Sequence, residues 1–180
     1  PSQVKEVLAK IAKSKLKKSA VVISIAAGVN LKQLQGYLGG KHAVVRAMPN
    51  TPCIVGQGVT AITNGKYANA GHTKFAKEIF SAVGLCLELD EKHFDAVTGL
   101  GGSGPAYFYL IMEALADGGV RVGLPRDLAL KIVVQTMLGS ATVVQKLGRH
   151  PASLRDDVTT PAGCTIGALL IMEDGKIRST

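Results

Sequence analysis

The feature that most constrains the fold is a change of pattern near residue 90. Before it, segments with strand and helix patterns alternate, whereas after it no segment has the pattern of a strand. Strands separated by helices form a sheet of mostly parallel order. We therefore expect an α/β part over residues 1–90 and an all-α part over residues 91–180.

The first part carries apolar, β-branched runs that predict strands, and amphipathic runs between them that predict helices. Asn30 suits the N-cap of a short helix, and the glycines at its end suit its stop. The expected strands lie within residues 20–28, 43–52, 58–65 and 85–90, and the expected helices lie within residues 1–18, 30–40 and 72–84.

The second part begins with two long helical patterns, over residues 104–123 and 125–148. The second of these is apolar nearly all round, so we expect it to be buried on several faces. The all-α half is too small for its other helices to cover all of these apolar faces. A second subunit would supply the cover, and the sequence therefore predicts a homodimer.

Composition and termini narrow the class of protein. The chain of 180 residues starts at Pro1 without a methionine, so we expect it to be a piece of a longer protein. No run reads as a signal peptide or approaches the twenty apolar residues of a membrane span. Cys53, Cys86 and Cys164 fit neither a disulfide framework nor a metal site. We predict a cytoplasmic protein, with a mitochondrial location as the alternative, and neither a metal nor a membrane partner.

The net charge of +8 comes mostly from the start of the chain. Six lysines lie in the first eighteen residues, where they alternate with apolar residues as on the solvated face of a helix. No aromatic residues are interleaved with them to stack on bases. We therefore expect no nucleic-acid partner.

Residues 99–104, "GLGGSG", match the dinucleotide-binding pattern G-x-G-x-x-G. In that fingerprint a strand must run directly into the glycine turn. Here the preceding residues have the pattern of a helix, and Pro105 follows at once. We interpret the run as a flexible hinge between helices and not as a phosphate loop.

A threonine-rich cluster, residues 159–165, precedes the last apolar helical run. With Thr160 as N-cap and Pro161 in the first turn, the N–H groups of the next four residues would lack partners within the helix. Together with the helix dipole, they would suit a carboxylate or a phosphate. Local sequence leaves the alternative of an ordinary Thr-Pro cap open.

Several motifs, in order along the whole chain, resemble those of pyrroline-5-carboxylate reductases. They are "AAGV" (26–29), "RAMPNTP" (46–52), "DAVTGLGGSGPAY" (95–107), "ALADGGVRVGLPRDLA" (114–129) and "PASLRDDVTTPAGCTIGALLIME" (151–173). The resemblance implies the second part of a Rossmann-like dinucleotide-binding domain (1–90) and a helical dimerisation and substrate-binding domain (91–180). It also implies homodimers that can assemble into larger rings.

The implied reaction is the reduction of 1-pyrroline-5-carboxylate to L-proline by NADPH or NADH, the last step of proline biosynthesis. Hydride addition to an imine needs strict positioning and no strong nucleophile. The scattered histidines and cysteines of this chain agree with that requirement.

The resemblance also implies site residues. On the substrate side, the cluster residues Thr160, Gly163, Cys164 and Thr165 would hold the carboxylate, with the Thr165 hydroxyl near the ring nitrogen as the catalytic group, and Glu91 matches a substrate-contacting acid. On the cofactor side, the matching positions are Pro1, Ile25, Ala26, Ala27, Asn50 and Asp157, the last where some relatives have asparagine.

Two other interpretations stay open. The chain lacks the strand and glycine turn with which such reductases begin, so it could be a non-catalytic, truncated dimerisation piece, and we expect residues 1–180 alone to be inactive. A β-hydroxyacid-type dehydrogenase would need a catalytic lysine in its helical domain. Lys131 and Lys146 lack the glycine-rich neighbours expected there.

Overall fold

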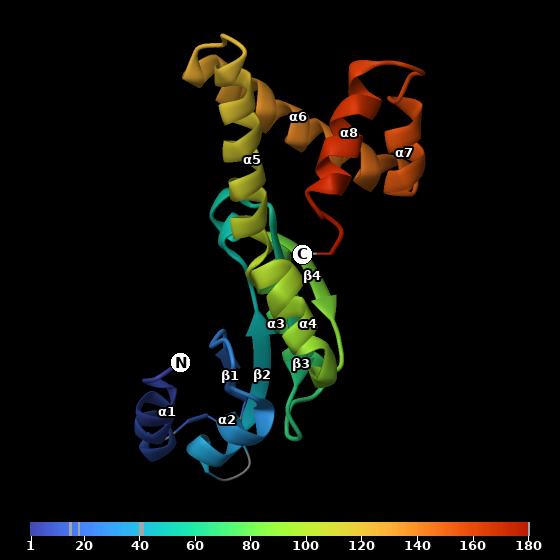
Figure 1. Ribbon diagram of the computed structural model, residues 1–180. Helices are drawn as coiled ribbons and strands as arrows, with labels where there is room; N and C mark the ends of the chain where they lie inside the picture. Colours follow the sequence, from blue (N-terminus) through green and yellow to red (C-terminus); the bar gives the residue numbers. More distant parts are fainter. Residues whose placement is uncertain (15, 18, 40–41, 180) are drawn as a thin grey trace. The chain divides into compact units, whose positions relative to one another are not determined.

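The computed structural model describes residues 1–14, 16–17, 19–39 and 42–179 (Figure 1). Its contacts divide the chain into two compact units, Pro1–Leu110 and Ile111–Thr180. The boundary between them along the chain falls within one helix, α5 (Gly104–Arg121). The domain boundary at residue 90 follows the sequence pattern and stays a prediction. The units are described one at a time.

The first unit alternates helices and strands up to Glu88, as expected. Its elements are α1 (Val4–Lys13), β1 (Val21–Ser24), α2 (Leu31–Leu38), β2 (Ala43–Met48), the 3-10 turn η1 (Thr51–Val55), β3 (Gly58–Asn64), α3 (Ala70–Ser81) and β4 (Gly84–Glu88). Each predicted strand and helix of this part is therefore present. The strand expected over 20–28 is shorter, because a turn with Gly28 at φ +75° follows it.

The four strands lie in the sheet in chain order, β1-β2-β3-β4. β1 runs parallel to β2, β2 antiparallel to β3, and β3 parallel to β4. Two of the three pairs are thus parallel, which confirms a mostly parallel sheet.

Helices cover both faces of this sheet, and alternate residues of β2 separate the two cores. Val44 packs with Leu34 and Leu38 of α2 and Leu8 of α1. Its neighbour Val45 faces the other way and packs on the far side with α3. A buried face on each side is what near-continuous apolar strands require.

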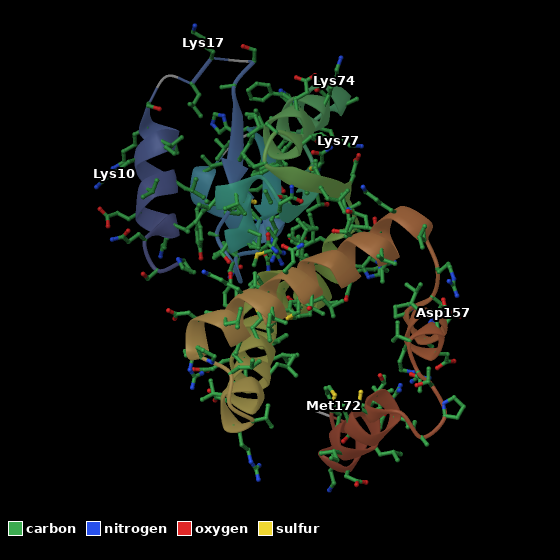
Figure 2. The ribbon with its side chains drawn as sticks, turned by 90° about the horizontal axis from the view of Figure 1, so that it is seen from above. Lys10, Lys17, Lys74, Lys77, Asp157 and Met172 are labelled. Carbon is green, nitrogen blue, oxygen red and sulfur yellow. The ribbon has the colours of Figure 1, made fainter. Side chains whose placement is uncertain are left out.

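Local signals in the sequence define the helix ends. The Asn30 side chain accepts a hydrogen bond from the Gln33 N–H, and the Gln33 side chain accepts one from the Asn30 N–H. Gly39 ends the same helix with φ +61°. On α1 the apolar side packs inward, and Lys10 projects away from the core (Figure 2). The prediction of a solvated helix face thus holds for Lys5, Lys10 and Lys13, whereas α1 ends before Lys17, and Lys15 and Lys18 lie outside the described residues.

A helical segment follows β4. It consists of η2 (Glu91–His93), α4 (Phe94–Val97), the π-helical turn η3 (Thr98–Gly102) and the start of α5. The expected hinge at residues 99–104 is therefore wrong. The Ser103 N–H donates to the Thr98 carbonyl, so the glycine-rich run continues the helix as one wide turn.

The second unit is all-α. It contains the remainder of α5, then α6 (Arg126–Leu147), α7 (Pro151–Asp157) and α8 (Cys164–Asp174). From Glu91 onward the described residues form no strand, which confirms the all-α expectation. Only Ala116 and Ala129 are buried among the described residues of this unit. Most of its apolar side chains are exposed within the single chain.

Helix α6 differs from one expectation. It has 22 residues and a mean hydropathy of 1.4, so by length and composition alone it could cross a membrane. We had expected no run to reach that limit. The criterion is a weak one, since buried helices of many proteins also meet it.

Candidate functional site

The first group of predicted site residues lies where two neighbouring strands end. Ile25, Ala26 and Ala27 follow β1, and Asn50 follows β2. Because β1 and β2 are parallel, their carboxyl ends meet at one edge of the sheet. In open α/β sheets ligands bind outside this edge. The structure therefore brings these residues to an edge that can receive a ligand.

The residues after β1 are turned in different directions. Ile25 is 62% exposed, whereas Ala26 packs against the core formed with α1 and α2. The Ala26 N–H donates a long hydrogen bond of 3.4 Å to Ser24 Oγ. The Ile25 side chain is therefore accessible at this strand end, whereas that of Ala26 is partly buried. Pro1 is also exposed, and its carbonyl accepts from the Val4 N–H at the start of α1.

Asn50 is held at both ends of its amide. Its Oδ1 accepts from the Val59 N–H at 2.9 Å, and its Nδ2 donates to the Gly101 carbonyl at 3.1 Å. The side chain therefore ties the end of β2 both to β3 and to the π-helical turn. The glycine-rich run thus has a packing role that its sequence did not reveal.

Glu91 starts the segment after β4, and its carboxylate is anchored. Its Oε1 accepts from the Leu31 N–H at 2.6 Å and from Arg46 Nη1 at 2.9 Å. A carboxylate at the first N–H groups of a helix is favourable, and α2 begins at Leu31. No local sequence pattern indicates this contact, which joins residues sixty positions apart.

Arg46 is the residue that the sequence analysis missed. Its side chain is 6% exposed, and its guanidinium lies 4.5 Å from the centre of the buried Phe94 ring. The available signal was a single charge inside the apolar run "AVVRAM", because a strand buried on both faces rarely contains an arginine unless it is paired.

The second group lies in the turn before α8, and here one prediction is wrong. Thr160 is not the N-cap, since α8 starts at Cys164 with Gly163 as its cap residue. The Gly163 N–H donates to the Thr160 carbonyl, and Ala162 takes a left-handed φ of +54°. Pro161 and Ala162 therefore form a turn ahead of the helix and not its first turn.

The helix end itself is open. No side chain caps α8, and no hydrogen bond within the described residues uses the N–H groups of Cys164, Thr165 and Ile166. The Thr165 hydroxyl also lacks a partner there. A side chain at position 163 would approach Thr160 Oγ1 to 2.4 Å, so glycine keeps this turn tight. Three N–H groups and a hydroxyl can receive a small anion.

Asp157 ends α7 and is already paired. Its Oδ2 lies 2.6 Å from Arg149 Nη1. The hydrogen bond from Arg149, helped by its charge, lowers the pKa of the Asp157 carboxyl, and slight desolvation opposes this. Asp157 is therefore an ionised acceptor that is exposed at the surface (Figure 2).

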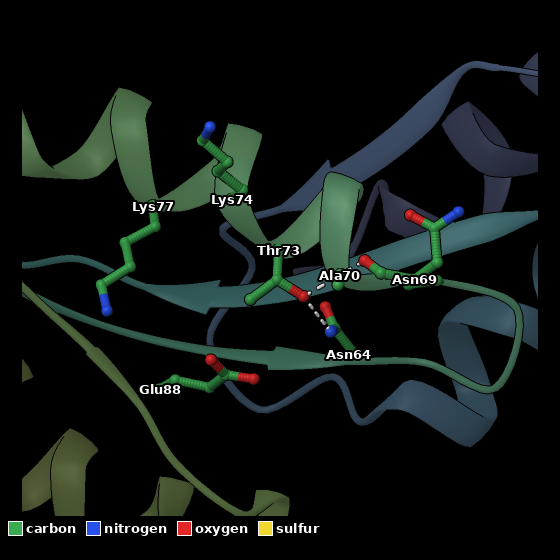
Figure 3. A pocket seen from close by; sticks show the side chains of 8 residues that line it. Asn64, Asn69, Ala70, Thr73, Lys74, Lys77 and Glu88 are labelled. Carbon is green, nitrogen blue, oxygen red and sulfur yellow. Dashed lines mark hydrogen bonds between the residues drawn. The ribbon is translucent and has the colours of Figure 1, made fainter.

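The eleven predicted site residues thus fall into two groups, one in each unit. Two surface hollows contain none of these residues. The larger, of about 460 Å³, lies beside α3, where Lys77 extends toward the strand that carries Glu88 (Figure 3). The other, of about 200 Å³, lies between α7 and α8. The described residues include no group of three or more His, Cys, Asp or Glu that could hold a metal ion.

Along its whole length, the chain is similar to pyrroline-5-carboxylate reductases. A family model described as pyrroline-5-carboxylate reductase dimerisation matches residues 91–180. Pyrroline-5-carboxylate reductase from Arabidopsis thaliana is 48% identical over 180 residues, which are all of this chain and 64% of that protein. The enzyme of the same name from Synechocystis is 50% identical over 160 residues, 88% of this chain and 59% of that protein.

Solved structures agree. The crystal structure of Plasmodium falciparum pyrroline carboxylate reductase with NADP bound has a TM-score of 0.92 and 35% identity, covering 99% of this chain and 71% of that one. A pyrroline-5-carboxylate reductase from Coxiella burnetii gives 0.91 and 34%, covering 99% and 67%.

These likenesses confirm the expected fold, a Rossmann-like part followed by a helical dimerisation part. The chain spans 64–65% of the length of the three plant relatives. The same relatives leave no support for the β-hydroxyacid dehydrogenase interpretation. By sequence and by structure, this chain belongs to the pyrroline-5-carboxylate reductase family.

Proposed function

We propose that the protein to which this chain belongs reduces 1-pyrroline-5-carboxylate to L-proline with NADPH or NADH. The observation that carries the proposal is the open N-terminus of α8, with its three N–H groups and the Thr165 hydroxyl. The names of the relatives, all pyrroline-5-carboxylate reductases, supply the substrate. The whole reaction is a proposal because the chain covers only part of their length.

The substrate carboxylate fits the turn before α8. The N–H groups of Cys164 and Thr165 would donate to its oxygens, and the positive end of the helix dipole would add attraction. Gly163 keeps the turn tight against Thr160, which lies exposed. The carboxylate would thereby orient the ring so that its nitrogen lies near the Thr165 hydroxyl.

The reaction moves one hydride and one proton. The hydride adds to the imine carbon, the electron pair of the C=N bond moves to nitrogen, and nitrogen ends as the amine with a proton. A hydroxyl that is hydrogen-bonded to this nitrogen stabilises the electron density that builds up on it as the hydride adds. We propose that Thr165 has this role and that Glu91 also contacts the substrate.

The dinucleotide would supply the hydride. Residues present here suit only its nicotinamide side. They are the exposed Ile25 with Ala26 and Ala27 after β1, Asn50 after β2, and the exposed Pro1. The run at residues 99–104 has a dinucleotide-like glycine pattern, but Gly101 and Gly102 pack against Val59 and Met48. This run is therefore not free to bind a pyrophosphate. The pyrophosphate would therefore need residues outside this chain. We propose that Asp157 accepts a hydrogen bond from the ribose.

Assembly follows from the exposed apolar surface of the helices. The large apolar side chains that lie exposed on α5, α6 and α8 include Tyr107, Phe108, Leu110, Leu115, Leu130, Ile132, Val134, Leu138, Val143, Leu170 and Ile171. A surface of this kind marks an interaction site, and the family model for residues 91–180 is a dimerisation model. We propose a homodimer that buries more than about 2,000 Å², as the unit of a larger ring, in the cytoplasm and not in a membrane.

The second candidate is a non-catalytic dimerisation piece. It is favoured by the same helical surface and by the dimerisation family model that matches residues 91–180. On this proposal, residues 1–180 form dimers and present the α8 end, yet transfer no hydride.

One experiment separates the two candidates. NADPH oxidation with 1-pyrroline-5-carboxylate is measured for the 180-residue chain and for a chimera with the N-terminal portion of the Arabidopsis thaliana relative placed before Pro1. We expect no turnover by the chain and turnover by the chimera. Calorimetric titration should show NADPH binding to the chain only at millimolar levels or weaker. An inactive, folded, dimeric chimera would instead support the non-catalytic piece.

A further inference from the structure

The end of strand β2 contacts the helical segment that follows β4. Val44, Arg46 and Met48 point to one face of the sheet, since side chains alternate along a strand. Val44 lies under α1 and α2. The other two contact residues 91–103, which we call the junction segment because the dimerisation family model begins at its first residue. The whole segment belongs to the first unit.

Arg46 binds the start of the junction segment. It pairs with Glu91 at 2.9 Å and stacks over Phe94, whose side chain is 0% exposed. A guanidinium buried in this way needs its partner, because an unpaired charge in the interior is costly. The pair therefore has one well-defined geometry. The same Glu91 oxygen also binds the Leu31 N–H, so α2 fixes the carboxylate from a second direction.

Asn50 is hydrogen-bonded to the end of the junction segment. Its amide joins the Gly101 carbonyl to the Val59 N–H, with 3.1 Å and 2.9 Å between the heavy atoms. The backbone approaches closely, since an added Cβ would lie 3.2 Å from Val59 Cγ1 at position 101 and 2.7 Å from Met48 Cε at position 102. The π-helical turn is therefore seated directly on β2 and β3.

We infer that Arg46 and Asn50 are positioning residues, which hold the junction segment and with it the Glu91 carboxylate at one fixed place on the sheet. Glu91 Oε2 takes no hydrogen bond from the described residues, and the side chain is 34% exposed. One oxygen is thus anchored while the other can meet a ligand. As a statement about catalysis, the inference rests on the function proposed above. Hydride transfer is sensitive to errors of about 1 Å in the placement of the reacting groups.

Hydrogen exchange on the 180-residue chain tests the positioning without any enzyme assay. Arg46→Met removes the charge and keeps the length of the side chain. We expect amide exchange in peptides covering residues 91–103 to rise about tenfold or more, because the segment then opens locally. Arg46→Lys should fall between Met and wild type, since it restores the ion pair without the planar stack. Asn50→Ala should raise exchange mainly at Val59 and in residues 98–103. Unchanged exchange in all variants would overturn the inference.

Kinetics of the chimera test the catalytic consequence. At a temperature well below the unfolding midpoint, Arg46→Met should lower kcat about tenfold or more, which corresponds to a rise of about 1.4 kcal/mol or more in the activation barrier. The KM for NADPH should stay unchanged. Arg46→Lys should recover part of kcat. Lys10→Met, which removes the exposed pair with Glu6, is the control and should leave kcat unchanged.

The outcomes are distinguishable. A variant with lowered thermal stability and unchanged kcat would show that Arg46 only stabilises the fold, and the catalytic part of the inference would be wrong. If the wild-type chimera itself is inactive, the proposed function fails, and the exchange experiment still decides whether the two residues hold the junction segment.

Discussion

The two units of this chain use apolar residues in opposite ways. In the first unit Leu34, Val44, Val45, Ile62 and Phe94 are each 0% exposed, and helices cover both faces of the sheet. In the second, Ala116 and Ala129 are the only buried residues among those described. The first unit has its own core, whereas the second presents apolar residues that a single chain leaves in water. The difference indicates that folding of one half is local and folding of the other depends on association.

The largest effect should come from a charge on the exposed apolar surface. Leu138 of α6 is 58% exposed, and we propose that a second chain covers it. Leu138→Glu would place a carboxylate without a partner in that interface. We expect loss of the dimer in sedimentation and loss of the helical signal of the second unit, while the sheet unit stays folded. Gln145→Glu on the same helix is the control. A dimer that survives Leu138→Glu would break the comparison.

A core substitution in the first unit should act regardless of concentration. Phe94→Ala removes a buried ring that also stacks with Arg46, and we expect it to cost about 3–5 kcal/mol of unfolding free energy. Denaturant titration at two protein concentrations should give the same loss for the transition of this unit. Phe75→Ala is the matched control, since that ring is 52% exposed. A loss that varied with concentration would mean that this unit, too, depends on the dimer.

The open end of α8 gives a smaller effect, on activity alone. In the chimera, Thr165→Ala should slow imine reduction about tenfold to a hundredfold, since a hydrogen bond to a developing polar centre is worth about 1.5–3 kcal/mol. NADPH affinity should hardly change. Thr159→Ala should do much less, because that hydroxyl bonds the Arg155 carbonyl within its own turn. Similar losses of activity in both variants would mean that residues 159–165 only form a structural turn.

The smallest effect concerns pH. Arg149 lowers the pKa of the Asp157 carboxyl in the folded chain. The pair therefore adds stability above the unfolded value of about 3.9, and this contribution is lost as the pH falls through the lower folded value. Thermal unfolding of wild type and Asp157→Asn at pH 7 and pH 3 should show a small difference at pH 7 that shrinks at pH 3. Asp174→Asn, outside the described ion pairs, should show no such trend.

Period and capping patterns predicted the elements well, because those signals are local. Asn30 is an N-cap in the structure, as its sequence position indicated. The prediction that Thr160 caps α8 was wrong, since the left-handed Ala162 adds a turn that propensity disfavours for alanine. The glycine run looked like a hinge because its packing partners, Val59 and Met48, are distant in sequence.

The candidate site was less predictable than the fold. Resemblance to the family supplied all eleven residues, and local chemistry supported only the cluster before α8. Arg46 went unnoticed because its partner Glu91 lies 45 positions away. Such a pair depends on the sheet that carries one partner and the helix that carries the other, and no window along the chain contains both.

The order of strands in the sheet has a consequence for synthesis. Val21 pairs with Ala43 and Gly58 with Gly84, so each strand adds to the edge left by the one before it. Among the described strands, each one after β1 pairs with the strand made just before it, and domains fold from the N-terminus as they emerge from the ribosome. The sheet can therefore assemble while the helices behind it are still being made. If the proposed dimer forms, those helices would then have to find a second chain, and the slow, concentration-dependent step of maturation would fall at the end.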